Sequence, residues 1–364
     1  MTAPVPAPGE PVGDLDDLEA LRAADPSGML DRVTQLPADA RAGYAAGRAV
    51  EGLPMIDDVS SIVVCGMGGS AVAGDLVRSV FRDRLTVPFE VVRGPQLPAY
   101  VGHHSLVVCS SYSGNTAETL SCFSEAQERG ARVLAITSGG RLGAAAGNLG
   151  VATTALPPGY QPRAALGQLA FGLLGMLEEA GWLPSTLEAD VEETARVLEG
   201  LAARLGPTAT GETNLAKDLA RRIGRRTPVI WGAEDIGSVA AMRWKTQMNE
   251  NGKTPAFSSA LPELDHNEVV GWTAGTGDGF FLIGLRVADE HPEVAPRFPL
   301  SIDIAEGAGL VTEEIVATGA TALSQLCSLI LTGDFASVYL GILRGFDPTP
   351  VEVIDRLKAS LTGA

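Results

Sequence analysis

One short segment after an apolar run concentrates hydroxyl side chains. In CSSYSGNT, residues 109–116, the hydroxyls of Ser110, Ser111, Ser113 and Thr116 stand at the start of a predicted helix. A single serine or threonine is enough to cap a helix N-terminus, so this number exceeds what capping needs. Hydroxyls and backbone amides that converge on one point suit the tetrahedral oxygens of a phosphate monoester. This turn therefore predicts a site for a phosphate group.

A second turn, rich in glycine, also joins an apolar run to a predicted helix. It is VCGMGGSA, residues 64–71, with Gly68, Gly69 and Ser70 at the predicted helix start. Glycine lets the chain turn sharply and lets a ligand approach the backbone. The helix behind the turn offers unpaired N–H groups and about half an elementary positive charge. An anion can bind there without a lysine.

Taken alone, the glycine turn fits other roles as well. Gly66, Gly68 and Ala71 match the dinucleotide pattern G-x-G-x-x-A, and Glu90 follows at the distance of a ribose-binding acid. An NAD-dependent oxidoreductase is therefore one alternative, and a packing turn without any ligand is another. A dinucleotide site has no use for the hydroxyl-rich turn, and this favours the phosphate monoester.

The two turns together, GMGGSAVAGD and SSYSGNTAET, resemble the sugar isomerase (SIS) domain. With PR at 162–163, NEN at 249–251 and DHNE at 265–268, the chain from about residue 38 to its end resembles the bifunctional phosphoglucose/phosphomannose isomerase family. The resemblance implies an α/β fold of two SIS-type doubly wound domains, each a parallel sheet flanked by helices. It also implies a metal-independent aldose–ketose isomerase without a cofactor. Such an enzyme interconverts glucose 6-phosphate and mannose 6-phosphate with fructose 6-phosphate through a cis-enediol(ate).

The resemblance implies roles for individual residues. Glu250, in KTQMNENGKTPAF, would be the base that moves the proton between C1 and C2. By residue type alone, a glutamate at a helix end is a solvated surface residue. Arg163, in PPGYQPRAALGQ, would stabilise the enediolate oxygens with its fixed charge. Without the resemblance, a salt bridge that anchors the helix competes as its role.

Ring opening requires a further acid/base group. By resemblance, His266 in LPELDHNEVVGW supplies it across a dimer interface to the partner's site, since imidazole can accept and return a proton near pH 7. The alternative is a histidine held in a loop by Asp265 or Glu268. Lys358, in VEVIDRLKASL, resembles the family's C-terminal lysine that assists the histidine, although by type it is a solvated lysine on an amphipathic helix. Thr349, in DPTPV, is similar to a family threonine beside the substrate.

The expected ligand is a hexose 6-phosphate. The resemblance implies that its phosphate binds the residues of the two turns, namely Gly68, Gly69, Ser70, Ser111, Ser113 and Thr116. A homodimer is expected because of the role implied for His266. The alternative function is a non-catalytic sugar-phosphate-binding SIS regulator, which would keep the turns but has no need for the catalytic set.

The elements that must position these residues follow from the hydrophobic pattern. Apolar, strand-like runs alternate with helical segments, which is typical of parallel α/β sheets. Strands are predicted at residues 60–66, 87–93, 105–110, 131–137 and 151–156, and again at 227–232, 279–287 and 309–317. Helices are predicted at residues 14–24, 38–53, 69–81, 116–129, 163–180, 185–206, 236–249, 320–344 and 350–361. Residues 289–304 are predicted to be an elaborated loop.

This alternation predicts the domain organisation. Residues 1–37 would be a flexible N-terminal tail, up to about residue 12, with leading helices. Residues 38–182 would form a first SIS domain with the phosphate-binding turns, and residues 183–208 a helical bridge. Residues 209–364 would form a second SIS domain and a C-terminal helix. The repeated alternation indicates a duplicated domain without a close sequence repeat.

Composition limits the classes of partner. The chain of 364 residues has 27 basic and 44 acidic residues, a formal net charge of −17 that disfavours nucleic acid and anionic membranes as partners. A phosphate must therefore be held by local donors. The four cysteines form no C-x-x-C pair, no histidine pattern typical of a zinc site is present, and we expect no metal. Without a signal-peptide pattern or disulfide framework, we expect a cytoplasmic protein.

Overall fold

The computed structural model describes residues 8–54 and 59–362. Its contacts divide the chain into two compact units. The first-sheet unit comprises Gln35–Glu199 and Thr318–Cys327. The second-sheet unit comprises the described residues up to Thr34, Gly200–Ala317, and the residues from Ser328 onward. This division differs from the domain ranges predicted from the sequence in two ways. The leading residues belong to the unit of the second sheet, and the boundary between Glu199 and Gly200 lies inside the predicted helical bridge.

Specific contacts explain why the leading segment belongs to the second-sheet unit. Gly9 donates its N–H to the carbonyl oxygen of Gly345 at 2.8 Å. The fully buried Lys217 donates its ammonium to Asp16 Oδ1 at 2.9 Å. Of the tail predicted up to about residue 12, residues 1–7 lie outside the described residues. Two short helices follow, α1 (Leu18–Ala24) and α2 (Met29–Thr34).

The first sheet has five parallel strands in the order β2-β1-β3-β4-β5. They are β1 (Ser61–Cys65), β2 (Phe89–Val92), β3 (Ser105–Ser110), β4 (Arg132–Thr137) and β5 (Thr153–Ala155). This is the order of flavodoxin-like doubly wound folds, in which ligands bind beyond the carboxyl ends of the strands where the order reverses. The reversal lies between β1 and β3, where Cys65 pairs with Cys109 in register. The predicted fold class is confirmed.

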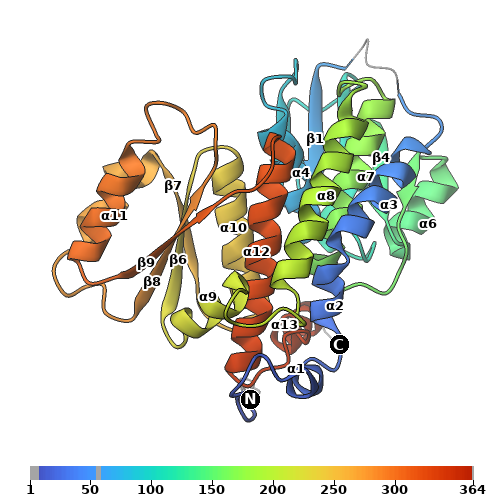
Figure 1. Ribbon diagram of the computed structural model, residues 1–364. Helices are drawn as coiled ribbons and strands as arrows, with labels where there is room; N and C mark the ends of the chain where they lie inside the picture. Colours follow the sequence, from blue (N-terminus) through green and yellow to red (C-terminus); the bar gives the residue numbers. More distant parts are fainter. Residues whose placement is uncertain (1–7, 55–58, 363–364) are drawn as a thin grey trace. The chain divides into compact units, whose positions relative to one another are not determined.

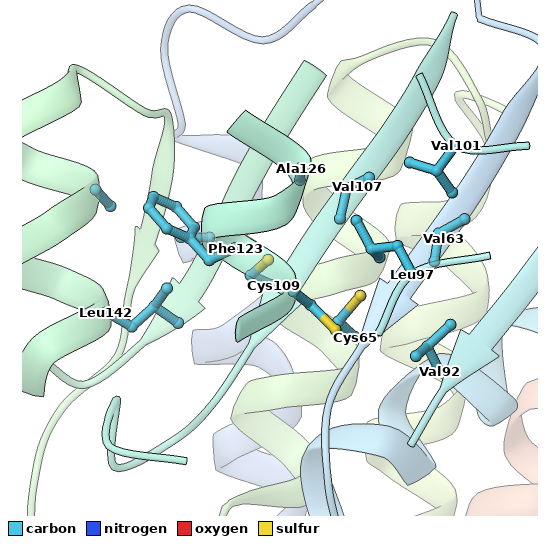
Figure 2. Packing of buried hydrophobic residues seen from close by; sticks show 13 residues of the cluster. Val63, Cys65, Val92, Leu97, Val101, Val107, Cys109, Phe123, Ala126 and Leu142 are labelled. Carbon is cyan, nitrogen blue, oxygen red and sulfur yellow. The ribbon is translucent and has the colours of Figure 1, made fainter. Parts of the chain in front are cut away.

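Buried apolar side chains hold these two strands in place. Every residue of β1 and β3 is buried, as expected for parallel strands covered on both faces. Figure 2 shows the cluster on one face, where Val63, Cys65 and Cys109 pack with Phe123 of α5 (Ala117–Glu128). All four cysteines of the chain are buried and free. The strands that precede the two predicted phosphate turns are therefore fixed by a continuous core.

Close helix packing explains part of the high glycine content. The other helices of this unit include α3 (Leu36–Arg48), α4 (Gly69–Val80), α6 (Gly140–Leu149), α7 (Leu166–Glu179) and most of α8 (Leu187–Leu205). A methyl group added at Gly47 of α3 would lie 2.2 Å from the carbonyl oxygen of Gly172 in α7. Only glycine permits so close an approach of two helix backbones.

The second sheet has four parallel strands in the order β7-β6-β8-β9. They are β6 (Thr227–Ala233), β7 (Phe257–Leu261), β8 (Phe280–Arg286) and β9 (Val311–Val316). The order matches that of the first four strands of the first sheet, which supports the predicted duplication. The helices of this unit include α9 (Leu215–Ile223), α10 (Ile236–Glu250), α11 (Arg297–Gly307) and α13 (Glu352–Thr362). Figure 1 shows α10 and α11 on opposite sides of this sheet.

The prediction for the second-sheet unit has one error and one omission. The loop predicted at 289–304 contains the beginning of α11, whose Phe298 and Ile302 are buried against the sheet. Its helical spacing was hidden by the prolines and charges around it. The edge strand β7 was not predicted, because its sequence FSSAL has only one fully buried residue, Leu261, and no continuous apolar run.

The longest helix, α12 (Ala322–Leu343), is apolar enough and long enough to cross a membrane. Its most apolar window is 94% buried inside the protein, as in a core helix. The polar side chains along it, including Ser328, Asp334 and Ser337, are buried as well. α12 therefore owes its apolar sequence to burial within the fold.

Candidate active site

The two predicted phosphate turns lie side by side at the carboxyl ends of β1 and β3. These strands are adjacent, and their last paired residues include Cys65 and Cys109. A methyl group added at Gly66 would lie 3.0 Å from the carbonyl oxygen of Ser110, so the turns touch. The position is the reversal point of the sheet order, where doubly wound folds bind ligands. Two turns read separately from the sequence thus form one edge of the first-sheet unit.

The backbone of the glycine turn has a conformation and a close contact that disfavour any residue with a side chain. Gly68 has φ 52° and ψ −127°, and it precedes α4 without a side-chain cap. The first residue of α4, Gly69, lies so close to the segment 162–163 that an added methyl group would be 2.8 Å from the carbonyl oxygen of Pro162. The same methyl group would be 3.4 Å from the Cα atom of Arg163. The backbone of Arg163, a predicted site residue, therefore lies next to the N-terminus of α4, where the backbone N–H groups are available to an anion.

The hydroxyl turn does not use its hydroxyls as a helix cap. Thr116 is the N-cap of α5 but accepts no capping hydrogen bond, and its Oγ1 instead lies 2.9 Å from the Oγ of Ser111. The Oγ of Ser113 accepts the N–H of Asn115 at 3.3 Å. Within the described chain, the buried Oγ of Ser110 has no hydrogen-bond partner. The capping explanation for this group of hydroxyls therefore fails.

Tyr112, which sequence reasoning did not single out, joins the hydroxyl turn to the segment that carries Arg163. Its hydroxyl donates to the carbonyl oxygen of Pro157 at 2.7 Å and accepts the N–H of Tyr160 at 2.9 Å. The two tyrosine rings also meet edge to face, with centroids 6.3 Å apart. Arg163 itself is 3% exposed, in a 3-10 turn ahead of α7. The only sequence signal for Tyr112 was its place between Ser111 and Ser113.

The dinucleotide alternative does not fit the strand register. Glu90 pairs with Val63 inside β2, two residues before the strand ends. Two residues of strand correspond to roughly 6.6 Å, which separates this carboxylate from the edge where a ribose would bind. The Glu90 carboxylate also accepts the Tyr100 hydroxyl at 2.6 Å. The glycine turn therefore lacks its acidic partner for a dinucleotide.

In the second-sheet unit, Glu250 is the last residue of α10, a helix that is anchored by buried contacts. Arg243 forms an ion pair with Asp334 of α12 at 2.8 Å, and the indole of Trp244 donates to the carbonyl oxygen of Leu329 at 2.8 Å. Just beyond the helix, the amide of Asn251 donates to the Ser337 hydroxyl at 3.0 Å. The end of α10 is thus held on both sides of Glu250.

Glu250 lines a cavity of about 350 Å³ within the second-sheet unit. The walls are the end of α10 and the segment that leads into α13, comprising Asn249, Lys253, Gly345, Phe346, Asp347 and residues 350–354. Thr349, 7% exposed, lies within this segment. Lys358 is exposed and follows the lining residue Ile354 by one helical turn, on the same face of α13. The structure thus brings Glu250 and the Thr349 segment together around one cavity.

The exposed His266 ends a 3-10 turn after β7 and is not among the residues that line this cavity. Its acidic neighbours are engaged elsewhere. Asp265 accepts the Ser301 hydroxyl at 2.6 Å, and Glu268 accepts the indole N–H of Trp231 at 2.9 Å. Asp265 and Glu268, the alternative partners for His266, therefore both bond to other side chains. α11, which carries Ser301, holds the turn that presents His266.

Among the described residues, no three His, Cys, Asp or Glu side chains gather in a way that could hold a metal ion. Arg163 belongs to the first-sheet unit, and Glu250, His266 and Lys358 belong to the second-sheet unit.

Models of known domain families match two parts of the chain. The SIS domain model matches residues 55–146, and the model of the bacterial phospho-glucose isomerase C-terminal SIS domain matches residues 212–361. A bifunctional phosphoglucose/phosphomannose isomerase of Caldicellulosiruptor bescii is 38% identical over 335 residues, covering 92% of this chain and 98% of the relative. A protein of the same name from Aquifex aeolicus is 36% identical over 302 residues, covering 82% of this chain and 90% of the relative.

The fold comparison gives the same architecture. The crystal structure of a hypothetical protein from Thermus thermophilus matches with a TM-score of 0.72 at 18% identity, covering 95% of this chain and 94% of that one. This likeness concerns the fold alone. The sequence relatives and the two matched domains show that the chain is an enzyme of the isomerase class that belongs to the bifunctional phosphoglucose/phosphomannose isomerase family.

Proposed function

We propose that this enzyme interconverts glucose 6-phosphate and mannose 6-phosphate with fructose 6-phosphate. The observation that carries the proposal is the pairing of two uncharged turns, rich in glycine and in hydroxyls, at the reversal point of the first sheet, in a chain whose relatives are named for this activity. The net charge of −17 repels a phosphate at long range. The phosphate must therefore be held by donors in direct contact with it, and the backbone N–H groups and hydroxyls of the two turns are such donors.

Different residues would take different parts in the reaction. The backbone of Gly68, Gly69 and Ser70 and the hydroxyls of Ser111, Ser113 and Thr116 would bind the phosphate. Glu250 would take the proton from one of the carbons C1 and C2 and return it to the other. The guanidinium of Arg163, permanently charged, would stabilise the negative charge on the enediolate oxygens. The two aldoses differ only at C2, whose configuration disappears in the shared enediol, so one base serves both. None of these steps needs a metal or a cofactor.

Ring opening would fall to His266 and Lys358, with Thr349 beside the substrate. The exposure of His266, and the engagement of both its acidic neighbours with other partners, leave its imidazole available to another molecule. We therefore propose a cytoplasmic homodimer in which His266 of one subunit serves the site of the other.

One set of assays tests both the isomerase activity and the role of Glu250 as the base. A coupled assay should detect fructose 6-phosphate formed from either aldose 6-phosphate. Glu250→Gln should lower kcat by at least about 10² to 10⁴-fold with substrate binding retained. Glu188→Gln, an exposed change in α8, serves as the matched control and should keep full activity. Sugar phosphate binding without turnover in the wild type would identify a regulator instead, and near-normal kcat in Glu250→Gln would remove that residue from its role.

The subunit arrangement has its own test. His266→Asn and Glu250→Gln should each be inactive, but co-expressed and randomly paired they should recover about a quarter of the wild-type activity, because half of the dimers are mixed and one of the two sites in each is intact. No recovery, with mixed dimers present by mass spectrometry, would show that His266 acts within its own subunit.

A further inference from the structure

Lys253 occupies an unusual position three residues after Glu250. Its backbone has φ 50°, in the left-handed region that residues with side chains seldom adopt and that costs about 1–2 kcal/mol. One other described residue with a side chain, Asp235, shares a positive φ. A lysine remains in this conformation only where its surroundings require it.

The surroundings are three backbone carbonyl groups. The Lys253 ammonium donates to the carbonyl oxygen of Glu250 at 2.6 Å and to that of Pro348 at 3.1 Å, and it also donates to that of Pro350. The Glu250 carbonyl is at the C-terminal end of α10. The last carbonyls of a helix have no partner within the helix, and the helix dipole favours a positive charge beside them. The two proline carbonyls flank Thr349, whose N–H donates to Asp347 Oδ1 at 2.9 Å.

These bonds tie together two separate pieces of the candidate site. One piece is the end of α10 with the Glu250 backbone, and the other is the turn at 347–350 from which α13 and Lys358 continue. Lys253 also lines the cavity that Glu250 borders. An ammonium group has three N–H donors, and three carbonyl oxygens receive them here. Its hydrogen-bonding capacity is therefore committed to the backbone, and this distinguishes Lys253 from a residue that contacts the substrate.

We propose that Lys253 is a positioning residue that clamps the 347–350 turn to the end of α10 and so fixes Thr349 and Lys358 relative to the Glu250 base. The catalytic part of this inference rests on the proposed function. The clamp itself rests only on the geometry, so the two can be tested separately.

The experiment compares Lys253→Met with Lys245→Met in the full-length protein. Methionine is also unbranched, and adopting the left-handed backbone conformation costs it the same energy as it costs lysine. The substitution removes the positive charge and all three N–H donors. Lys245, half-buried within α10, controls for loss of a positive charge. Hydrogen–deuterium exchange of peptides covering 345–352 reports the clamp, and kcat and KM on glucose 6-phosphate report its catalytic role.

In Lys253→Met we expect exchange in 345–352 to accelerate at least about tenfold while peptides of α12 keep their protection. We expect kcat to fall at least about tenfold with KM within about threefold, because the phosphate-binding turns are untouched. Lys253→Arg, whose guanidinium also donates to carbonyls, should regain at least about a third of the wild-type kcat. If Lys253→Met does not fold, Lys253→Gln, with two donors, should show the same changes to a smaller extent.

Unchanged exchange in 345–352 would overturn the clamp. Accelerated exchange with an unchanged kcat would overturn the positioning role and leave a purely structural contact. A wild type that turns over neither aldose 6-phosphate would overturn the proposed function, and with it the catalytic part of this inference, while the exchange data would still decide the clamp.

Discussion

The buried ion pair between Arg243 of α10 and Asp334 of α12 is the best place to test how the helix that carries Glu250 is held. The pair is bidentate, with Nε to Oδ1 at 3.1 Å and Nη2 to Oδ2 at 2.8 Å. The two side chains are 2% and 7% exposed, so water screens the pair little. Both residues lie in the second-sheet unit.

The perturbation is a double-mutant cycle. Arg243→Met removes the ion pair and leaves the Asp334 carboxylate buried. Asp334→Leu removes the same ion pair and leaves the Arg243 guanidinium buried. Breaking a buried pair in this way costs about 3–5 kcal/mol, because the remaining charge has lost its solvent and its partner. Replacing both residues removes both charges, and such apolar replacements are often neutral or stabilising. The double variant should therefore be more stable than either single variant by about 3 kcal/mol or more.

The assay is urea unfolding followed by tryptophan fluorescence. Three of the four tryptophans, Trp231, Trp244 and Trp272, lie in the second-sheet unit, so the signal reports mainly the unit that is perturbed. The double variant should also keep kcat within about threefold, since the Trp244 and Asn251 contacts still anchor α10. A double variant as unstable as the two single variants together would refute the reasoning, because it would show that the charges themselves are not the cost.

Three further predictions follow from contacts near the turns and the leading segment. Tyr112→Phe should lower stability by about 1–3 kcal/mol and reduce kcat/KM, because it removes the bridge to the Arg163 segment. Tyr160→Phe loses the hydroxyl bond to Asp39 but keeps the backbone N–H of the bridge, so as the control in denaturation and steady-state assays it should lose stability and keep kcat/KM. Gly69→Ala should raise KM at least about tenfold, because its methyl group would lie 2.8 Å from a backbone oxygen; unchanged KM would contradict the tight approach. The hydrogen bond from Lys217 lowers the pKa of Asp16, so this stabilisation is present above the unfolded-state pKa and is lost as the pH falls through the folded-state pKa. Urea unfolding between pH 6 and 3 should show a smaller loss of stability for Asp16→Asn than for the wild type.

Local signals in the sequence were sufficient for much of this protein. The apolar runs of β1 and β3 are buried on both faces, so their sequences are continuous and their positions were predicted to within a residue. The two predicted phosphate turns stand out in the sequence because their glycines and their hydroxyls lie in consecutive residues. The motifs around Arg163, Glu250 and His266 likewise occupy short, continuous segments.

Only the tertiary structure decided how these segments meet. The order β2-β1-β3-β4-β5 brings two turns more than forty residues apart to one edge, and no local pattern encodes strand order. The engagement of Asp265 with Ser301 depends on α11, a helix predicted to be a loop. The clamp at Lys253 joins it to Pro348 and Pro350, nearly a hundred residues later. A residue's type limits which bonds it can form, but the fold determines which partners lie within reach, because partners distant in the chain meet only when the core brings their backbones together.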